Sequence, residues 1–135
     1  MPVNLSQPIK KNIFSIPGIS LGTIESGIKY ANRKDLTLIL LDEGSIVAGV
    51  FTKNQFLAAP VKVAKYHLSS GSNKRALLIN TGSANAGTGD VGIDNAKQTC
   101  HALAQILNIS GTITDGQGNV LAGANVIVDG TENGS

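Results

Sequence analysis

The chain is poor in the residues from which metal, disulfide and nucleic-acid sites are built. One cysteine and two histidines are too few for a disulfide framework or a cysteine-rich zinc site. Tryptophan is absent and aromatic residues make up only 4%, which argues against stacking surfaces for single-stranded nucleic acid. No apolar run approaches the roughly 18 residues of a membrane span, and the proline-interrupted N-terminus lacks the apolar core of a secretory leader. We therefore expect a cytoplasmic protein with no metal, no cofactor, no nucleic-acid partner and no membrane partner.

Basic residues are missing from the last part of the chain. All 11 lysines and arginines precede Ile109, where the net charge is +5, whereas residues 109–135 carry three acids and a net charge of −3. The basic residues are scattered along the first part, which favours a solvated surface over a nucleic-acid patch. The change in composition near residue 109 instead predicts a chain in two parts, residues 1–108 and 109–135.

The first part alternates strand-like and helix-like segments. Leu36–Leu41 and Ser45–Phe51 are β-rich runs separated by Asp-Glu-Gly, which predicts a hairpin with Gly44 at positive φ. Arg75–Asn80 is a further short apolar strand. Residues 1–18, interrupted by three prolines, are expected to be irregular.

Two helices are expected between and after these strands. Pro60 suits the first turn of a helix that ends near Ser69, because Val61, Ala64 and Leu68 recur at helical spacing. Five apolar residues predict the second helix, with an acid near its start: Ile93, Ala96, Cys100, Leu103 and Leu107. The composition and pattern therefore predict an α/β fold in which helices pack against a mixed sheet, with a short C-terminal β appendage.

The loop before the second helix contains Gly87, Gly89 and Gly92, a G-x-G-x-x-G pattern. In dinucleotide-binding folds the first glycine follows the strand directly, but here six residues separate it from Asn80. No Lys-Ser or Lys-Thr follows the glycines, which excludes a P-loop. We interpret the glycines as structural, since they can adopt positive φ, while leaving open that the loop presents backbone N–H groups to an anionic substrate.

Residues 79–89 read INTGSANAGTG and resemble the Asn-Thr-Gly-Asn-Ala-Asn-Ala-Gly-Thr-Gly signature of the glutamate N-acetyltransferase family, the ornithine acetyltransferases of arginine biosynthesis. Four further segments follow the family's N-terminal order and spacing: residues 17–22, 27–61, 67–68 and 75–82. Ser83 departs from the pattern, because the family usually has asparagine there. The resemblance covers about residues 1–108 and implies part of the family's α chain.

The resemblance also implies a reaction and a set of site residues. Enzymes of this family transfer an acetyl group from N-acetylornithine to glutamate through a threonine that self-cleavage exposes at the start of a β chain. Their Ala-Thr-Met-Leu cleavage sequence and Ser-Thr-Gly oxyanion segment do not occur in this chain. We therefore expect no catalytic residue here, no activity of this chain alone, and a β chain as its partner. Six loop residues are expected near the substrate of an intact enzyme: Asn80, Thr81, Gly82, Asn85, Thr88 and Gly89.

Residues 109–135 resemble the opening of a carboxypeptidase-regulatory-like β-sandwich domain. Strands are expected at 111–115 and 124–130, separated by a glycine-rich turn. The chain would then join a partial acetyltransferase α-chain-like domain to a partial β segment near Asn108–Gly111. Two alternatives to a catalytic part remain open: a non-catalytic interaction module whose tail adds a strand to a partner's sheet, and a chimeric fusion without selected function.

The remaining candidates for chemistry have simpler explanations. Cys100 and His101 are neighbours on a helix and point about 100° apart, so they do not form a nucleophile–base pair. Cys100 also lies on the apolar stripe, where a buried, inert thiol is expected. His67, near a helix C-terminus, is interpreted as structural. Thr81 and Thr88 could contact substrate or serve hydrogen bonds within the loop.

Overall fold

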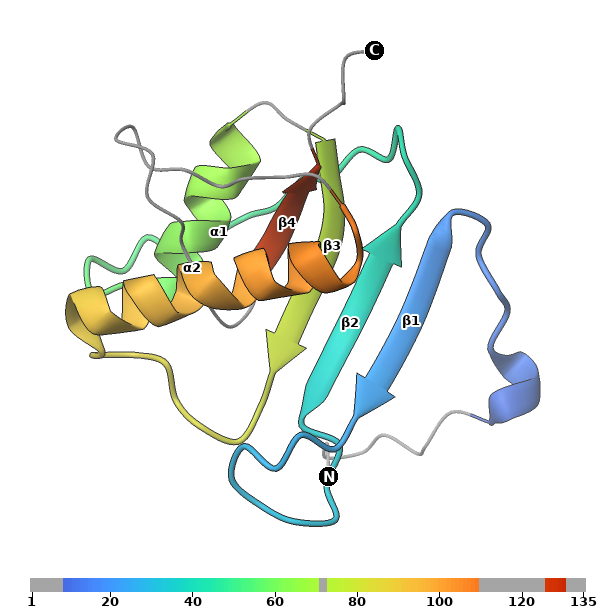
Figure 1. The fold of residues 1–135 in the computed structure, drawn as a ribbon, viewed down its shortest axis with the longest axis horizontal. Coiled ribbons are helices and arrows are strands. Elements are labelled where there is room, and N and C mark those ends of the chain that lie inside the picture. Colours follow the sequence, from blue (N-terminus) through green and yellow to red (C-terminus); the bar gives the residue numbers. More distant parts are fainter. Residues whose placement is uncertain (1–8, 71–72, 110–125, 131–135) are drawn as a thin grey trace.

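The computed structural model describes residues 9–70, 73–109 and 126–130. A four-stranded sheet lies at its centre, and α2 crosses in front of that sheet in the view of Figure 1. The strands follow one another in space as in sequence: β1 (Ile19–Ile24), β2 (Leu36–Leu41), β3 (Asn73–Asn80) and β4 (Val126–Gly130). The helical elements are the short 3-10 helix η1 (Lys10–Asn12), α1 (Ala59–Ser69) and α2 (Gly89–Ile106).

The α/β class is confirmed, and the sheet is antiparallel where a mixed sheet was expected. Each pairing of the described strands is antiparallel, because each strand pairs with its neighbour in sequence and reverses direction. The helix α1 lies between β2 and β3 in sequence, yet those two strands also pair antiparallel. The connection through α1 therefore does not form the parallel crossover that helices between strands usually indicate.

The prediction of a β-hairpin between β2 and Ser45–Phe51 is wrong. Gly44 does adopt a positive φ of 82°, and the Ser45 N–H donates to the Asp42 carbonyl across the turn (3.2 Å). However, Ser45–Phe51 continues as irregular chain. The physical reason is that β1 and β3 already occupy both edges of β2, so the segment after the turn has no edge of β2 to pair with.

Both expected helices are confirmed. Pro60 lies in the first turn of α1, where its missing N–H costs no helical hydrogen bond. Thr88 is the N-cap residue of α2 and makes no side-chain capping bond, while Asp90 places its negative charge in the first turn. None of the helices in the described ranges is long and apolar enough to cross a membrane.

Small side chains allow the two helices and the sheet to approach closely. The buried cluster takes residues from α1, β3 and α2: Ala59, Val63, Ala76, Ala96, Cys100 and Ala104. Half-buried leucines of β2, Leu38 and Leu40, pack against it. Burial raises the pKa of the Cys100 thiol to about 12, so the sulfur stays protonated at neutral pH, and the expectation of a buried thiol is confirmed. His67 is buried in the last turn of α1.

The C-terminal part of the chain contributes a strand to this same sheet. β4 pairs antiparallel with β3, so that Val126 lies opposite Leu78 and Gly130 lies opposite Asn73. The strand expected at 124–130 is thus present over Val126–Gly130, whereas the strand expected at 111–115 lies outside the described residues.

Candidate functional site

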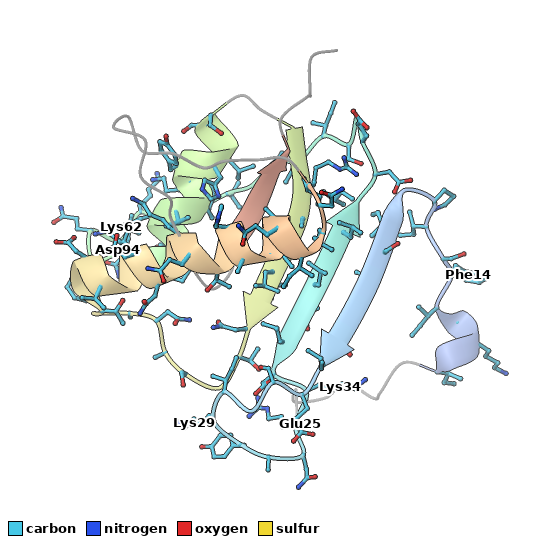
Figure 2. The ribbon with its side chains drawn as sticks, viewed as in Figure 1. Phe14, Glu25, Lys29, Lys34, Lys62 and Asp94 are labelled. Atoms are coloured by element: carbon cyan, nitrogen blue, oxygen red, sulfur yellow. The ribbon has the colours of Figure 1, made fainter. Side chains whose placement is uncertain are left out.

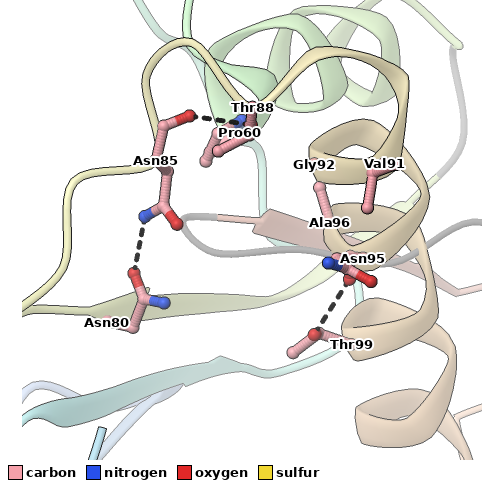
Figure 3. Close-up of a pocket in the computed structure, with 9 residues that line it drawn as sticks. All are labelled: Pro60, Asn80, Asn85, Thr88, Val91, Gly92, Asn95, Ala96 and Thr99. Atoms are coloured by element: carbon pink, nitrogen blue, oxygen red, sulfur yellow. Dashed lines mark hydrogen bonds between the residues drawn. The ribbon is translucent and has the colours of Figure 1, made fainter. Parts of the chain in front are cut away.

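The family-like loop leaves β3 at Asn80 and enters α2 at Gly89, and a cavity of about 390 Å³ lies beside it (Figure 3). We call it the asparagine cavity. Its walls come from the end of β3, the loop, the start of α1 and one face of α2: Pro60, Asn80, Asn85, Thr88, Val91, Gly92, Asn95, Ala96 and Thr99. The cavity therefore collects residues from four segments that are up to about 40 positions apart in sequence, as tertiary packing often does for binding sites.

Hydrogen bonds fix the polar side chains of the loop. Asn85 Nδ2 donates to Asn80 Oδ1 (3.2 Å), and Thr88 Oγ1 donates to the Asn85 carbonyl (3.2 Å), as Figure 3 shows. A carboxamide has two N–H donors and a carbonyl acceptor, so this single bond leaves both asparagines with further capacity to bind a ligand. The loop thus presents ordered amide groups at the cavity.

On the other wall, α2 contributes residues spaced by four along one face. Val91, Asn95 and Thr99 line the cavity, and Thr99 Oγ1 donates to the Asn95 carbonyl (3.1 Å) within the helix. Because the buried stripe of α2 runs through Ala96, Cys100 and Ala104, the polar wall lies beside that stripe rather than opposite it. One face of α2 therefore packs in the core, and the adjacent face lines the cavity.

The glycine pattern in this loop has a structural explanation. Gly87 and Gly89 adopt positive φ values of 71° and 59°, which L-residues with side chains rarely adopt. A Cβ on Gly92 would lie 1.8 Å from Thr88 Oγ1 and 2.4 Å from Thr88 Cβ, so the position has no room for a side chain. Backbone conformation and close packing thus account for all three glycines without a bound phosphate.

The structure brings three of the six expected loop residues to the cavity. Asn80, Asn85 and Thr88 line it, whereas Thr81, Gly82 and Gly89 are not among its lining residues. The Thr81 N–H donates to the Asp35 carbonyl (2.8 Å), and Gly82, at φ 110°, lies against Lys29. Gly89 is the first residue of α2.

Asp35 was missed by the sequence analysis. Its side chain is only 3% exposed, and it accepts hydrogen bonds from the backbone N–H and the hydroxyl of Ser26 and from the Ile28 N–H, each 2.7 Å long. The bonds from Ser26 contribute most to lowering the pKa of Asp35 below its ordinary value of 3.8, because they favour the ionised carboxylate. A single aspartate before an apolar run carries no sequence signal of such a role.

The part of the chain that the structure describes shows no metal-binding cluster, and its cysteine lies buried in the core. There, no three histidine, cysteine, aspartate or glutamate side chains come together as a metal site would require. Cys100 Sγ donates to the Ala96 carbonyl (3.5 Å) inside the core. The neighbouring His101 is half-buried, on a different side of the helix.

Comparison with known proteins supports the resemblance seen in the loop. Residues 20–121 match the ArgJ family, a match that begins in β1 and continues past residue 108. The arginine biosynthesis bifunctional protein ArgJ of Colwellia psychrerythraea strain 34H is 47% identical over 119 aligned residues, which cover 81% of this chain and 28% of that protein.

Two solved structures share the fold. Arginine biosynthesis bifunctional protein ArgJ from Bacillus halodurans matches with a TM-score of 0.65 and 30% identity, over 85% of this chain and 57% of that one. Ornithine acetyltransferase from Mycobacterium tuberculosis, solved in complex with ornithine, matches with a TM-score of 0.66 and 31% identity, over 88% of this chain and 58% of that one. This chain therefore spans 28% of the curated relative and just under three fifths of the solved chains. With most of its length matched, the chain belongs to the ArgJ family.

Proposed function

We propose that this chain forms part of the substrate-binding side of an ornithine acetyltransferase of arginine biosynthesis. The observation that carries the proposal is the convergence of Asn80, Asn85 and Thr88, three residues of the family-like loop, on one cavity. Support comes from the family of the chain and from the solved ornithine acetyltransferase that holds ornithine. We assign the asparagine cavity to N-acetylornithine or glutamate.

The chemistry of the cavity suits such a ligand. N-acetylornithine carries a carboxylate, an ammonium group, an amide and an aliphatic chain. The carboxamides of Asn80 and Asn85 offer donors to the carboxylate or the acetyl oxygen and acceptors to the ammonium group. Pro60, Val91 and Ala96 offer apolar contact to the methylene groups. None of the lining residues carries a charge, so specificity would come from hydrogen bonding and shape.

The acetyl-transfer step itself is assigned to another chain. Neither the Ala-Thr-Met-Leu cleavage sequence nor the Ser-Thr-Gly oxyanion segment of the family is present in these residues. We propose that a β chain supplies the nucleophilic threonine and that this chain, measured alone, transfers no acetyl group. Loss of one oxyanion donor alone costs on the order of a hundredfold in rate. We also propose a cytoplasmic location, from the family's place in arginine biosynthesis.

A titration followed by NMR tests the binding proposal. N-acetyl-L-ornithine and L-glutamate are added in turn to the 135-residue chain, and the side-chain amide signals of Asn80 and Asn85 are followed. We expect both signals to shift with saturation in the parent chain, and the shift of the Asn80 signal to be lost in Asn85→Ala. Gln105→Ala, which removes an exposed carboxamide near the far end of α2, is the matched control and should bind as the parent chain does. Binding that survives Asn85→Ala unchanged would contradict the proposed site.

An acetyl-transfer assay tests the division of roles. The purified chain is incubated with N-acetylornithine and labelled glutamate, and N-acetylglutamate is measured by mass spectrometry. We expect no product above the uncatalysed background. Turnover that follows the purified chain through chromatography would show that these residues carry a nucleophile of their own.

A further inference from the structure

The carboxylate of Asp35 joins the Glu25–Lys34 loop to the sheet. That loop connects β1 to β2, and Figure 2 shows Glu25, Lys29 and Lys34 gathered at the end of the sheet from which the chain leaves β3. Three donors converge on the carboxylate at 2.7 Å: the Ser26 N–H, the Ser26 hydroxyl and the Ile28 N–H. A buried carboxylate with three short bonds orders the backbone that supplies them, because an unpaired charge at 3% exposure is costly.

The backbone of the same residue joins two more segments. The Asp35 N–H donates to the carbonyl of Ile24 at the end of β1 (3.1 Å). Its carbonyl accepts from the N–H of Thr81, the first residue after β3 (2.8 Å). Asp35 therefore holds the Glu25–Lys34 loop with its side chain and the start of the family-like loop between β3 and α2 with its main chain.

A second contact connects the two loops directly. A Cβ placed on Gly82 would lie 3.3 Å from the Cβ of Lys29, so the Glu25–Lys34 loop packs closely on the residue after Thr81. Gly82 itself has a φ of 110°, a conformation that favours glycine. Thr81 and Gly82 are thus held on one side by the main chain of Asp35 and on the other by the loop that the Asp35 carboxylate orders.

We infer that Asp35 is a positioning residue of the asparagine cavity. By fixing Thr81 and Gly82, it fixes the direction in which the chain leaves β3, and with it the separation of Asn80 from Asn85, whose side chains meet at 3.2 Å. The inference deepens the proposed function, on which its ligand-binding part rests. Asp35 does not itself line the cavity, so it acts through the loop and not on a ligand.

Amide hydrogen exchange on Asp35→Asn tests the inference. An asparagine has one acceptor oxygen where the aspartate has two, so it cannot hold both Ser26 and Ile28. We expect exchange at the Ser26 and Ile28 amides to accelerate roughly tenfold, the effect of losing one charge-assisted hydrogen bond, and exchange at Thr81 and Gly82 to accelerate with them. The side-chain amide signals of Asn80 and Asn85 should shift in the same variant.

Glu43→Gln is the matched control, because it removes the same charge from an exposed carboxylate that lies 4.0 Å from Arg75. It should leave the signals of Thr81, Gly82 and Asn85 unchanged. Faster exchange at Ser26 and Ile28 with no change at Thr81, Gly82 and Asn85 would overturn the inference, because Asp35 would then serve its own loop alone. If Asp35→Asn does not fold, Ser26→Ala, which removes only the hydroxyl bond, carries the same comparison.

Ligand affinity distinguishes a positioning role from a purely structural one, because a loss of stability alone does not change the affinity of the folded protein. At a temperature where both proteins are fully folded, Asp35→Asn should bind N-acetyl-L-ornithine roughly tenfold more weakly than the parent chain. Equal affinities, together with unchanged Asn80 and Asn85 signals, would overturn the positioning role. If the parent chain binds neither N-acetyl-L-ornithine nor L-glutamate, the proposed function fails, and the exchange comparison still decides what Asp35 does.

Discussion

At the scale of single residues, the position of the Thr88 side chain explains why residue 92 is a glycine. Thr88 occupies the space that a side chain at position 92 would need, while it also donates to the Asn85 carbonyl. The third glycine of the G-x-G-x-x-G pattern is therefore a consequence of where the threonine lies. The resemblance to a nucleotide fingerprint arises from positive φ at Gly87 and Gly89 and from close packing at Gly92.

Gly92→Ala is expected to destabilise the protein by about 1–3 kcal/mol, although alanine is the better helix former. The reason is the 2.4 Å approach of the new Cβ to Thr88 Cβ, which rotation of the threonine cannot relieve. Urea denaturation of the two proteins measures the difference. In a Thr88→Gly background the same substitution should become neutral or stabilising, and an equal loss in both backgrounds would contradict this explanation.

Asp35 should make the stability of the protein depend on pH in the acid range. Hydrogen bonds from Ser26 lower its pKa in the folded state, so the folded protein binds a proton less readily than the unfolded chain. The stabilisation is therefore complete above the ordinary pKa of 3.8 and is lost as the pH falls through the lower folded pKa. Melting temperatures of the parent chain and Asp35→Asn should differ most above pH 4 and converge in stronger acid. A difference that stays constant down to pH 2 would contradict this assignment.

At the scale of elements, the strands differ in how much they contribute to the stability of the fold. β1 is an edge strand and all six of its residues are exposed, whereas β3, inside the sheet, carries the buried Ala76 and Leu78. An exposed edge with apolar side chains is also a surface on which another strand could pair. The stability of the fold therefore depends on β3 and its helices more than on β1.

Matched leucine substitutions on the two strands test this contrast. Leu78→Ala, at 6% exposure, should cost about 2–5 kcal/mol through lost burial and the cavity left behind. Leu21→Ala, at 71% exposure, should cost less than about 1 kcal/mol. Both values follow from urea denaturation of the single variants. Similar losses at the two positions would mean that β1 is covered in solution by a second copy or another chain.

At the scale of the whole molecule, the described C-terminal strand belongs to the same sheet as the rest. β4 extends the sheet beyond β3, and the match to the ArgJ family runs to residue 121. The division into residues 1–108 and 109–135, suggested by the loss of basic residues and by a second resemblance, remains a prediction. In a two-part chain, the second part would stabilise the first by pairing with its exposed edge.

Removal of residues 109–135 tests the division. We expect residues 1–108 to retain a cooperative thermal transition, because the buried cluster identified among the described residues comes from α1, β3 and α2, even though β4 also contacts both helices. The melting temperature should fall, since β3 loses its antiparallel partner along Asn73–Leu78. Circular dichroism on heating measures both features. Loss of cooperative melting would contradict the division, and an unchanged melting temperature would show that β4 adds no stability.

Local pattern was sufficient for the elements that carry the core. The spacing of Ile93, Ala96 and Cys100 predicted α2, and the apolar run after Arg75 predicted most of β3, because burial of one face imposes a period on the sequence. β1 was not predicted, because it contains Gly22 and has no buried face to impose such a period.

The residues of the candidate site also divide into those that local sequence predicted and those that it did not. Asn80, Asn85 and Thr88 were predicted from the resemblance of one contiguous loop. Asn95 and Thr99 were not, because polar residues beside the apolar stripe of a helix look the same in sequence whether they face solvent or a cavity.

The sequence by itself determined the class of the fold, its helices, three of its four described strands and the family to which the chain belongs. These depend on periodicity, turn residues and motifs, which act over a few neighbouring positions. Only the tertiary structure showed which strands pair with β2 and which residues of α2 line the asparagine cavity. It also showed that Asp35 is hydrogen-bonded to two loops. Each of these depends on contacts between segments that are distant in sequence. The local pattern of residues does not encode which distant segments come into contact.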